Sequence, residues 1–146
     1  MQSTSSIHPE IKPFAFQNRT VYRDLLRLIM TVKEIQSTQI SDLGKTFMHE
    51  LFNGTNILSK YIAHVYLVEI NPIKIDIVAR TIGTTVDVMN ALDICFEAKW
   101  IPAIQYFEAK QILEKTYWFL KDEQRSIHTW IQTNTREDCN NSKQFQ

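Results

Sequence analysis

Three arginines on one side of a predicted helix are the first residues in this chain whose type and spacing could do chemistry. Arg19, Arg23 and Arg27 are spaced by four, so a helix would place them in one basic row, with Asp24 and Glu34 off it. A guanidinium group can make two parallel hydrogen bonds to a phosphate or a carboxylate. The row therefore predicts a phosphate or partner contact, and a solvated face without a partner is the alternative. In a ring of copies the row would be repeated, which would strengthen its field.

The remaining polar side chains do not form a catalytic or metal-binding pattern. The sequence has no glycine-rich phosphate loop, no Gly-x-Ser-x-Gly, no His-Glu-x-x-His and no Cys-x-x-Cys. His49 and Glu50 are adjacent and would point in different directions on a helix, and no glutamate is followed three residues later by histidine. We therefore expect no enzyme activity, no metal site and no cofactor. A small enzyme or metal carrier with a bundle core is the competing hypothesis.

Composition favours one helical domain. The chain has 146 residues, of which 44% are hydrophobic, but only 3 glycines and 4 prolines for tight turns. Lysine plus arginine balance aspartate plus glutamate at 16 each, so a basic excess typical of nucleic-acid binders is absent from the sequence. The two cysteines, Cys95 and Cys139, have no metal-like spacing, which suggests a reducing compartment.

Four amphipathic segments follow one another along the chain. The first runs from about Thr20 to Gln36, and Ser37-Thr38 or Ser41-Asp42 can cap the second. Asn71-Pro72 is typical of the start of the third helix, and Pro102 opens the fourth in the same way. The apolar stripe predicted for the third helix consists of Ile75, Val78, Ile82, Val86, Met89, Leu92 and Phe96.

These segments predict an all-α, up-down-up-down four-helix bundle over residues 19–132. Residues 1–18 are expected to be a flexible N-terminal segment, and residues 133–146 a disordered polar tail. Gly54 lies inside the second helix and predicts a close approach of another helix. The join before Pro102 is apolar, so Trp100 and Ile101 are expected to fold back over the bundle end with Tyr106 and Phe107.

The apolar stripes are wider than a lone bundle needs. Such an excess predicts self-association, with exposed patches acting as subunit interfaces, whereas a thick monomeric core is the alternative. The most apolar region, Ile57 to Ile82, is interrupted by eight charged, polar or proline residues, so it falls short of the near-continuous apolar stretch of a membrane span. The N-terminus lacks the pattern of a signal peptide. We therefore expect a soluble, cytoplasmic protein without membrane contact.

The order of these segments, over roughly Tyr22 to Trp130, resembles a known family of small four-helix bundles. That family contains the proteins encoded in ribosomal-RNA intervening sequences and the accessory variability determinants of diversity-generating retroelements. The residues that carry the resemblance are Val21-Tyr22-Arg23-Asp24-Leu25-Leu26, Leu43-Gly44-Lys45, Asn90-Ala91-Leu92-Asp93-Ile94, Ala98-Lys99-Trp100-Ile101, Pro102, Tyr106 and Trp130. The segment Asn56 to Ala63 lacks the proline usual in the ribosomal branch, which favours the retroelement branch.

The resemblance implies a homopentameric barrel without catalysis. In the retroelement branch it implies an accessory subunit that binds a reverse transcriptase and its template RNA, or an RNA/DNA hybrid, and supports mutagenic cDNA synthesis. Under that hypothesis Arg19, Arg23, Arg27 and Lys45 are the residues to test for contact with the partner or the nucleic acid. The alternative is a stand-alone oligomeric interaction protein of the ribosomal-RNA intervening-sequence type.

Overall fold

The chain folds as four helices in the computed structural model, which describes residues 19–38, 41–69 and 72–144. The helices are α2 (Thr20–Ser37), α3 (Asp42–Leu67), α4 (Pro72–Glu97) and α5 (Ala103–Gln144), and no strand occurs among these residues. The predicted all-α, four-helix class is therefore confirmed. The observed α2 agrees with the predicted first helix to within one residue at its end.

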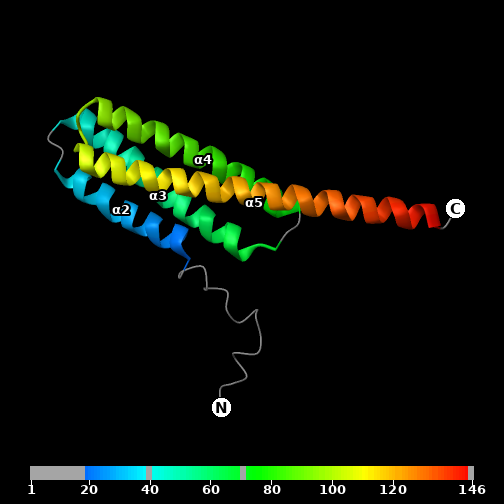
Figure 1. Cartoon of the computed structure of the whole chain (residues 1–146). Coiled ribbons are helices and arrows are strands. Elements are labelled where there is room, and N and C mark those ends of the chain that lie inside the picture. Colours follow the sequence, from blue (N-terminus) through cyan, green and yellow to red (C-terminus); the bar gives the residue numbers. More distant parts are fainter. Residues whose placement is uncertain (1–18, 39–40, 70–71, 145–146) are drawn as a thin grey trace, which may run out of the picture.

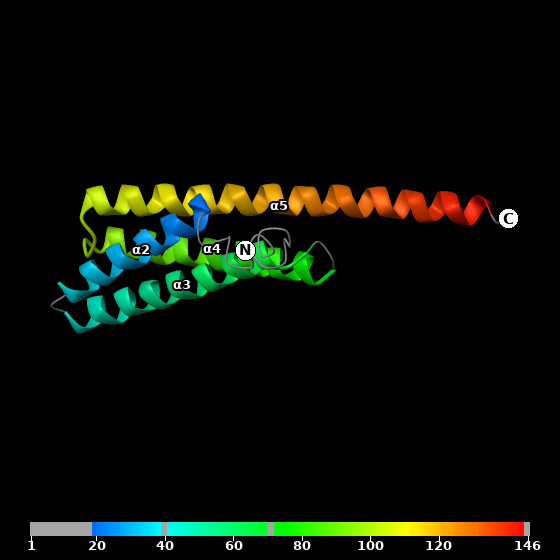
Figure 2. The ribbon, with the colours of Figure 1, turned by 90° about the horizontal axis from the view of Figure 1, so that it is seen from below.

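The helices form a bundle in which each one packs on two others. α2 and α4 each contact both α3 and α5, so α2 and α4 lie diagonally across the bundle (Figure 1). α3 and α4 have 26 residues each, whereas α2 has 18 and α5 has 42. Since a helix rises about 1.5 Å per residue, α5 is about 63 Å long and extends beyond the other helices (Figure 2).

Two helix starts confirm the predicted signals. The Ser41 side chain accepts a hydrogen bond of 3.0 Å from the Gly44 amide, so Ser41 rather than Ser37 is the N-cap of α3. α4 begins at Pro72, where the missing N–H of proline costs nothing. The predicted cap Asn71 lies outside the described residues. At α5, the Pro102 carbonyl accepts the Tyr106 amide at 2.9 Å, so Pro102 immediately precedes the helix.

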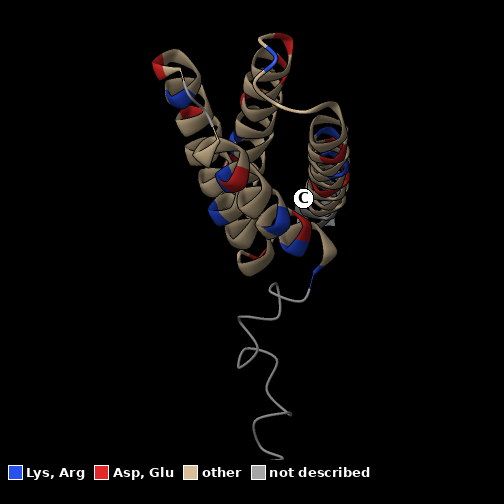
Figure 3. Cartoon of the chain, turned by 90° about the vertical axis from the view of Figure 1, so that its left-hand side faces the viewer, with Lys and Arg blue, Asp and Glu red and all other residues tan. Residues whose placement is uncertain are grey.

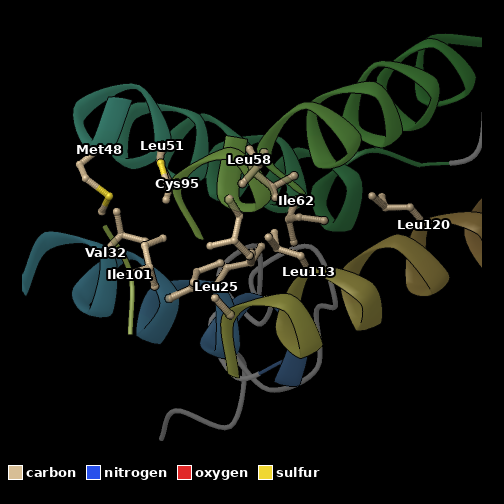
Figure 4. Packing of buried hydrophobic residues seen from close by; sticks show 14 of the residues in the cluster. Leu25, Val32, Met48, Leu51, Leu58, Ile62, Cys95, Ile101, Leu113 and Leu120 are labelled. Atoms are coloured by element: carbon tan, nitrogen blue, oxygen red, sulfur yellow. The ribbon is translucent and has the colours of Figure 1, made fainter. Parts of the chain in front are cut away.

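The core lies along the bundle axis and is built from the inward faces of all four helices. Leu25 of α2 lies near Leu58 and Ile62 of α3 and Leu113 of α5, and Val32 of α2 lies further along the same core (Figure 4). All five side chains are buried. Burying a leucine or isoleucine side chain contributes about 1.5–3 kcal/mol, so this shared core is what holds the helices together.

The predicted inward stripe of α4 was wrong at its centre. Val86 is exposed, and the buried face instead runs through Thr81, Thr85 and Val88. The Thr81 and Thr85 hydroxyls donate to the carbonyl oxygens of Ile77 and Thr81 at 2.6 and 2.8 Å. Because the hydroxyl is satisfied by its own helix, each threonine presents a methyl group to the core and behaves as an apolar residue.

The segment predicted as a disordered polar tail, residues 133–146, is helical as far as Gln144 in the described part of the chain. α5 continues without a break to Gln144, and Thr133 donates to the Thr129 carbonyl as a regular helical side chain does. The segment contains no glycine or proline, so nothing in it terminates the helix. The predicted flexible segment 1–18 lies outside the described residues.

The α4–α5 join has the apolar character that the sequence predicts. The Lys99 and Trp100 amides bond to the Phe96 and Cys95 carbonyls at 2.9 and 3.0 Å, which is a Schellman motif with Lys99 at φ 66°. Ile101 is buried, and the Trp100 ring lies 5.6 Å from that of Phe47. These two side chains therefore fold back over the bundle end.

Candidate functional site

The arginine row lies on the outer face of α2. Arg23 and Arg27 are exposed on the helix, and Arg19 precedes its first residue as the N-cap. The Arg19 guanidinium lies 5.8 Å from the centroid of the Tyr66 ring at the end of α3, a cation–π contact. Figure 3 shows that lysine and arginine are interspersed with acidic residues on the helices instead of covering one face.

The positive charge of the arginine row is lower than its sequence spacing predicts, because Asp24 forms an ion pair with Arg27. Its carboxylate lies 3.1 Å from the Arg27 guanidinium, although the spacing had placed Asp24 off the row. The long arginine side chain folds back by three residues to reach it, as i,i+3 pairs do on a helix. A shallow hollow of about 220 Å³ is lined by Thr20, Arg23, Asp24 and Arg27, so an incoming anion would meet a carboxylate as well as two guanidinium groups.

Lys45 does not join the row. It is exposed in the first turn of α3, which follows the C-terminal end of α2. Arg27 is ten residues before the end of α2, which corresponds to about 15 Å along the helix. The structure therefore places Arg23 and Arg27 beside one hollow and the Arg19 guanidinium over Tyr66 of α3, and it leaves Lys45 at the other end of α2.

Two large apolar side chains share the outer face of α2 with the arginines. Met30 is 63% exposed and Leu26 is 42% exposed, and both face away from the buried Leu25 and Leu28. A row intended for phosphates alone gains nothing from a methionine, whereas protein interfaces are enriched in methionine and arginine. This face therefore has the composition of a protein-binding surface.

A polar network that the sequence did not predict connects α4 and α5. The Tyr106 hydroxyl donates to Asp93 Oδ1 at 2.6 Å, and Lys110 Nζ donates to Oδ1 and Oδ2 of the same carboxylate at 2.8 and 2.9 Å. Phe96 stacks on the Tyr106 ring with centroids 3.9 Å apart. The four-residue spacing of Tyr106 and Lys110 was a possible signal, but identifying Asp93 requires the register of the hairpin.

The network shifts the pKa of each member. Burial alone would raise the pKa of Asp93, but the hydrogen bonds from Lys110 and Tyr106 and the Lys110 charge outweigh it and hold that pKa below its usual value. The hydrogen bond to Asp93 raises the pKa of Lys110 and the pKa of Tyr106. All three shifts favour a fully formed ion pair at neutral pH, which pins the two helices together.

Beside this network the outer faces of α4 and α5 form a hollow lined by both apolar and polar side chains. Its volume is about 330 Å³, and its lining consists of Val86, Met89, Asn90, Asp93, Lys110, Glu114, Tyr117 and Trp118. Trp118, which is 60% exposed, lies in the lining of this hollow. Phe107, which is 63% exposed, lies about 16 Å from Trp118 by helix rise, toward the N-terminal end of α5. Aromatic side chains of this kind are the residues that dominate protein interfaces.

Two other residues considered for chemistry, His49 and Cys95, occupy structural positions. His49 forms hydrogen bonds with Asn53 and Gln36, and Cys95 is a buried free thiol. Across the described residues no group of three or more His, Cys, Asp or Glu side chains is placed to hold a metal ion. None of the helices described is both long enough and apolar enough to cross a membrane.

Comparison with known proteins adds no information about the role of these residues. Neither the protein-family models, nor the curated proteins, nor the solved structures give a match to the chain.

Proposed function

We propose that the chain is a non-catalytic, self-associating accessory subunit of a diversity-generating retroelement. In this role it binds a reverse transcriptase and supports mutagenic cDNA synthesis on the template RNA. The retroelement part is supported by the sequence resemblance, with its ordered segments from Val21 to Trp130. The four-helix fold and the apolar Trp100-Ile101 join are compatible with it.

Large apolar side chains are exposed on all four helices, and the observation that carries the assembly part is that several of them share the outer face of α2 or the outer faces of α4 and α5. Met30 lies on α2, and Val86, Phe107 and Trp118 lie on α4 and α5. Exposed apolar groups that gather on a face, and are not scattered singly, mark interaction surfaces. This pattern supports a protein that works by binding other chains.

Direct binding of the template RNA by this chain is less well supported than binding of the reverse transcriptase. The arginine row has three guanidinium groups, but the Asp24 carboxylate offsets one of them, and the whole chain has a net charge of zero. Nucleic-acid affinity depends on the number of phosphates neutralised. We therefore propose that the reverse transcriptase holds most of the RNA, and that any direct RNA binding by this chain is weak and falls steeply with added salt.

Co-expression tests this function. The chain, carrying an affinity tag, is produced together with a reverse transcriptase encoded beside it, and the purified material is passed over a sizing column. We expect the two proteins to elute together, whereas a tagged unrelated four-helix bundle of similar size should not retain the enzyme. Separate elution of the chain and the reverse transcriptase would contradict the proposal.

The ribosomal-RNA intervening-sequence type is the second candidate. The zero net charge favours it, because the resemblance leads us to expect a basic chain in the retroelement branch. Genomic position separates the two. A coding sequence inside a ribosomal-RNA gene supports this second candidate, and one beside a reverse transcriptase and a template repeat supports the first.

A further inference from the structure

We infer that the outer face of α2 in one copy docks into the α4/α5 hollow of a second copy, with Met30 as the inserted side chain. This inference rests on the self-association in the proposed function and assigns the two surfaces that make the contact. We define the α2 face as Arg23, Leu26, Arg27 and Met30, and the α4/α5 face as Val86, Phe107, Glu114 and Trp118 together with the hollow between them.

Shape supports this pairing. Met30 is an unbranched side chain that projects from α2 with 63% of its surface exposed. The hollow of about 330 Å³ has Val86, Met89 and Trp118 in its lining beside polar and charged residues, so it offers apolar contacts and an aromatic ring to an incoming side chain. Methionine fills irregular apolar gaps well and makes favourable contacts between its sulfur and aromatic rings.

Charge supports it as well. Arg23 and Arg27 border Met30 on the α2 face, and the exposed Glu114 lines the hollow on the α4/α5 face. Asp93 and Lys110 in the hollow already satisfy each other. Docking would therefore bring the Arg23 guanidinium, and the Arg27 guanidinium that already pairs with Asp24, to the Glu114 carboxylate. With a net charge of zero, copies of the chain do not repel one another.

The position of the two faces allows the contact to repeat. α2 and α4 are diagonal in the bundle, so the α2 face and the α4/α5 face point in different directions. One copy can therefore use both faces at once, each with a different neighbour. Such a head-to-tail contact builds a closed ring where its rotation closes, and a chain of copies otherwise.

Mixing two interface variants tests the inference. Met30→Asp damages only the α2 face and Trp118→Asp only the α4/α5 face, and both side chains are largely exposed, so circular dichroism should show unchanged helix content. By sedimentation velocity we expect each variant alone to associate about thirty-fold more weakly, as loss of one dominant interface side chain does. An equimolar mixture should form a one-to-one dimer, because each variant keeps the face that the other has lost.

A control variant at an unrelated exposed position and a charge-reversal pair across the proposed interface distinguish the possible results. Leu43→Asp, at an exposed position on α3, should assemble as the wild type does. Arg27→Glu should weaken assembly, and adding Glu114→Arg to the same chain should restore it.

The inference is overturned by a mixture that stays monomeric, by single variants that assemble like the wild type, or by a wild-type chain that is monomeric throughout. Loss of RNA binding in Arg27→Ala with unchanged assembly would also overturn it, and would assign the arginines to phosphate. The reverse-transcriptase co-elution is read separately and can succeed or fail independently of these results.

Discussion

The Tyr106 hydroxyl and the Asp93 carboxylate are joined across the α4–α5 hairpin by a hydrogen bond of 2.6 Å, and Lys110 binds the same carboxylate through both oxygens. This contact fixes the register of the two helices whose outer faces form the proposed docking hollow. The hydrogen bonds to this carboxylate stabilise the folded state more while it stays ionised, because hydrogen bonds to a charged group are stronger than neutral ones.

Replacing Asp93 with asparagine should therefore cost stability in a pH-dependent way. We expect a loss of about 1 kcal/mol at pH 7, at the low end for a charged hydrogen bond because the site is partly exposed. The pKa of Asp93 is lowered on folding, so its contribution is present above the ordinary aspartate pKa of about 3.9 and is lost as pH falls through the folded value. Urea unfolding at pH 7 and pH 3 measures this difference.

The contribution of Lys110 to stability changes with pH in the opposite direction, because it is lost at alkaline pH. Its pKa is raised on folding, so its contribution is present below the ordinary lysine pKa of about 10.4 and is lost as pH rises through the folded value. The gap in stability between wild type and Asp93→Asn should thus be widest in the neutral range. A gap that stays constant from pH 3 to pH 11 would show that the ion pair is not its source.

Lys99 occupies a backbone position that favours glycine, with φ at 66°. A residue with a Cβ atom is strained there, so Lys99→Gly should stabilise the chain by about 1 kcal/mol and raise its melting temperature by about 3 °C. Lys99→Ala is the control, because it removes the lysine side chain and keeps the strain. Equal effects of the two substitutions would rule out relief of strain as the cause.

Two of the three helical glycines, Gly54 and Gly83, should respond differently to alanine. A Cβ atom at Gly83 would meet no atom within 4 Å, so Gly83→Ala should stabilise by about 1 kcal/mol through helix propensity. At Gly54 the new Cβ would lie 3.1 Å from Val88 Cγ2, and Val88 is buried and restricted to one rotamer in a helix. Gly54→Ala should therefore lose most or all of that gain, which thermal unfolding of both variants can compare.

Cys95 should be inert while the chain is folded. Burial, with a smaller effect from the Glu50 carboxylate, raises the pKa of its thiol to about 11. At pH 8 the reactive thiolate would then be about 100-fold rarer than for an ordinary cysteine. In a Cys139→Ser background, a colorimetric disulfide reagent should react with Cys95 only after urea is added. Fast reaction in buffer alone would show that the α4 core face opens readily.

Local signals predicted much of the fold. Proline at positions 72 and 102 and the serine cap at position 41 act within one turn of the chain, so the sequence identified those helix starts correctly. The close approach at Gly54 was also predicted, and Val88 of α4 provides it. The helix starts depend on residues close together in the sequence, so they can be predicted from it. The close approach can be predicted because a glycine inside a helix usually marks a place where another element comes near.

Features that depend on contacts between helices were harder to predict. A hydropathy pattern treats threonine as polar, so the buried Thr81 and Thr85 shifted the predicted inward face of α4 toward Val86. The spacing of the arginines did not show that Arg27 would fold back onto Asp24. Asp93 and Lys110 are seventeen residues apart, and only the hairpin register brings them together.

The central claim, that this chain works by assembling with copies of itself, is tested most directly by its mass in solution. Native mass spectrometry of the full chain should show species at whole-number multiples of 17.2 kDa, with the multimer growing at the expense of the monomer as protein concentration rises. A single 17.2 kDa species at every concentration would contradict the claim.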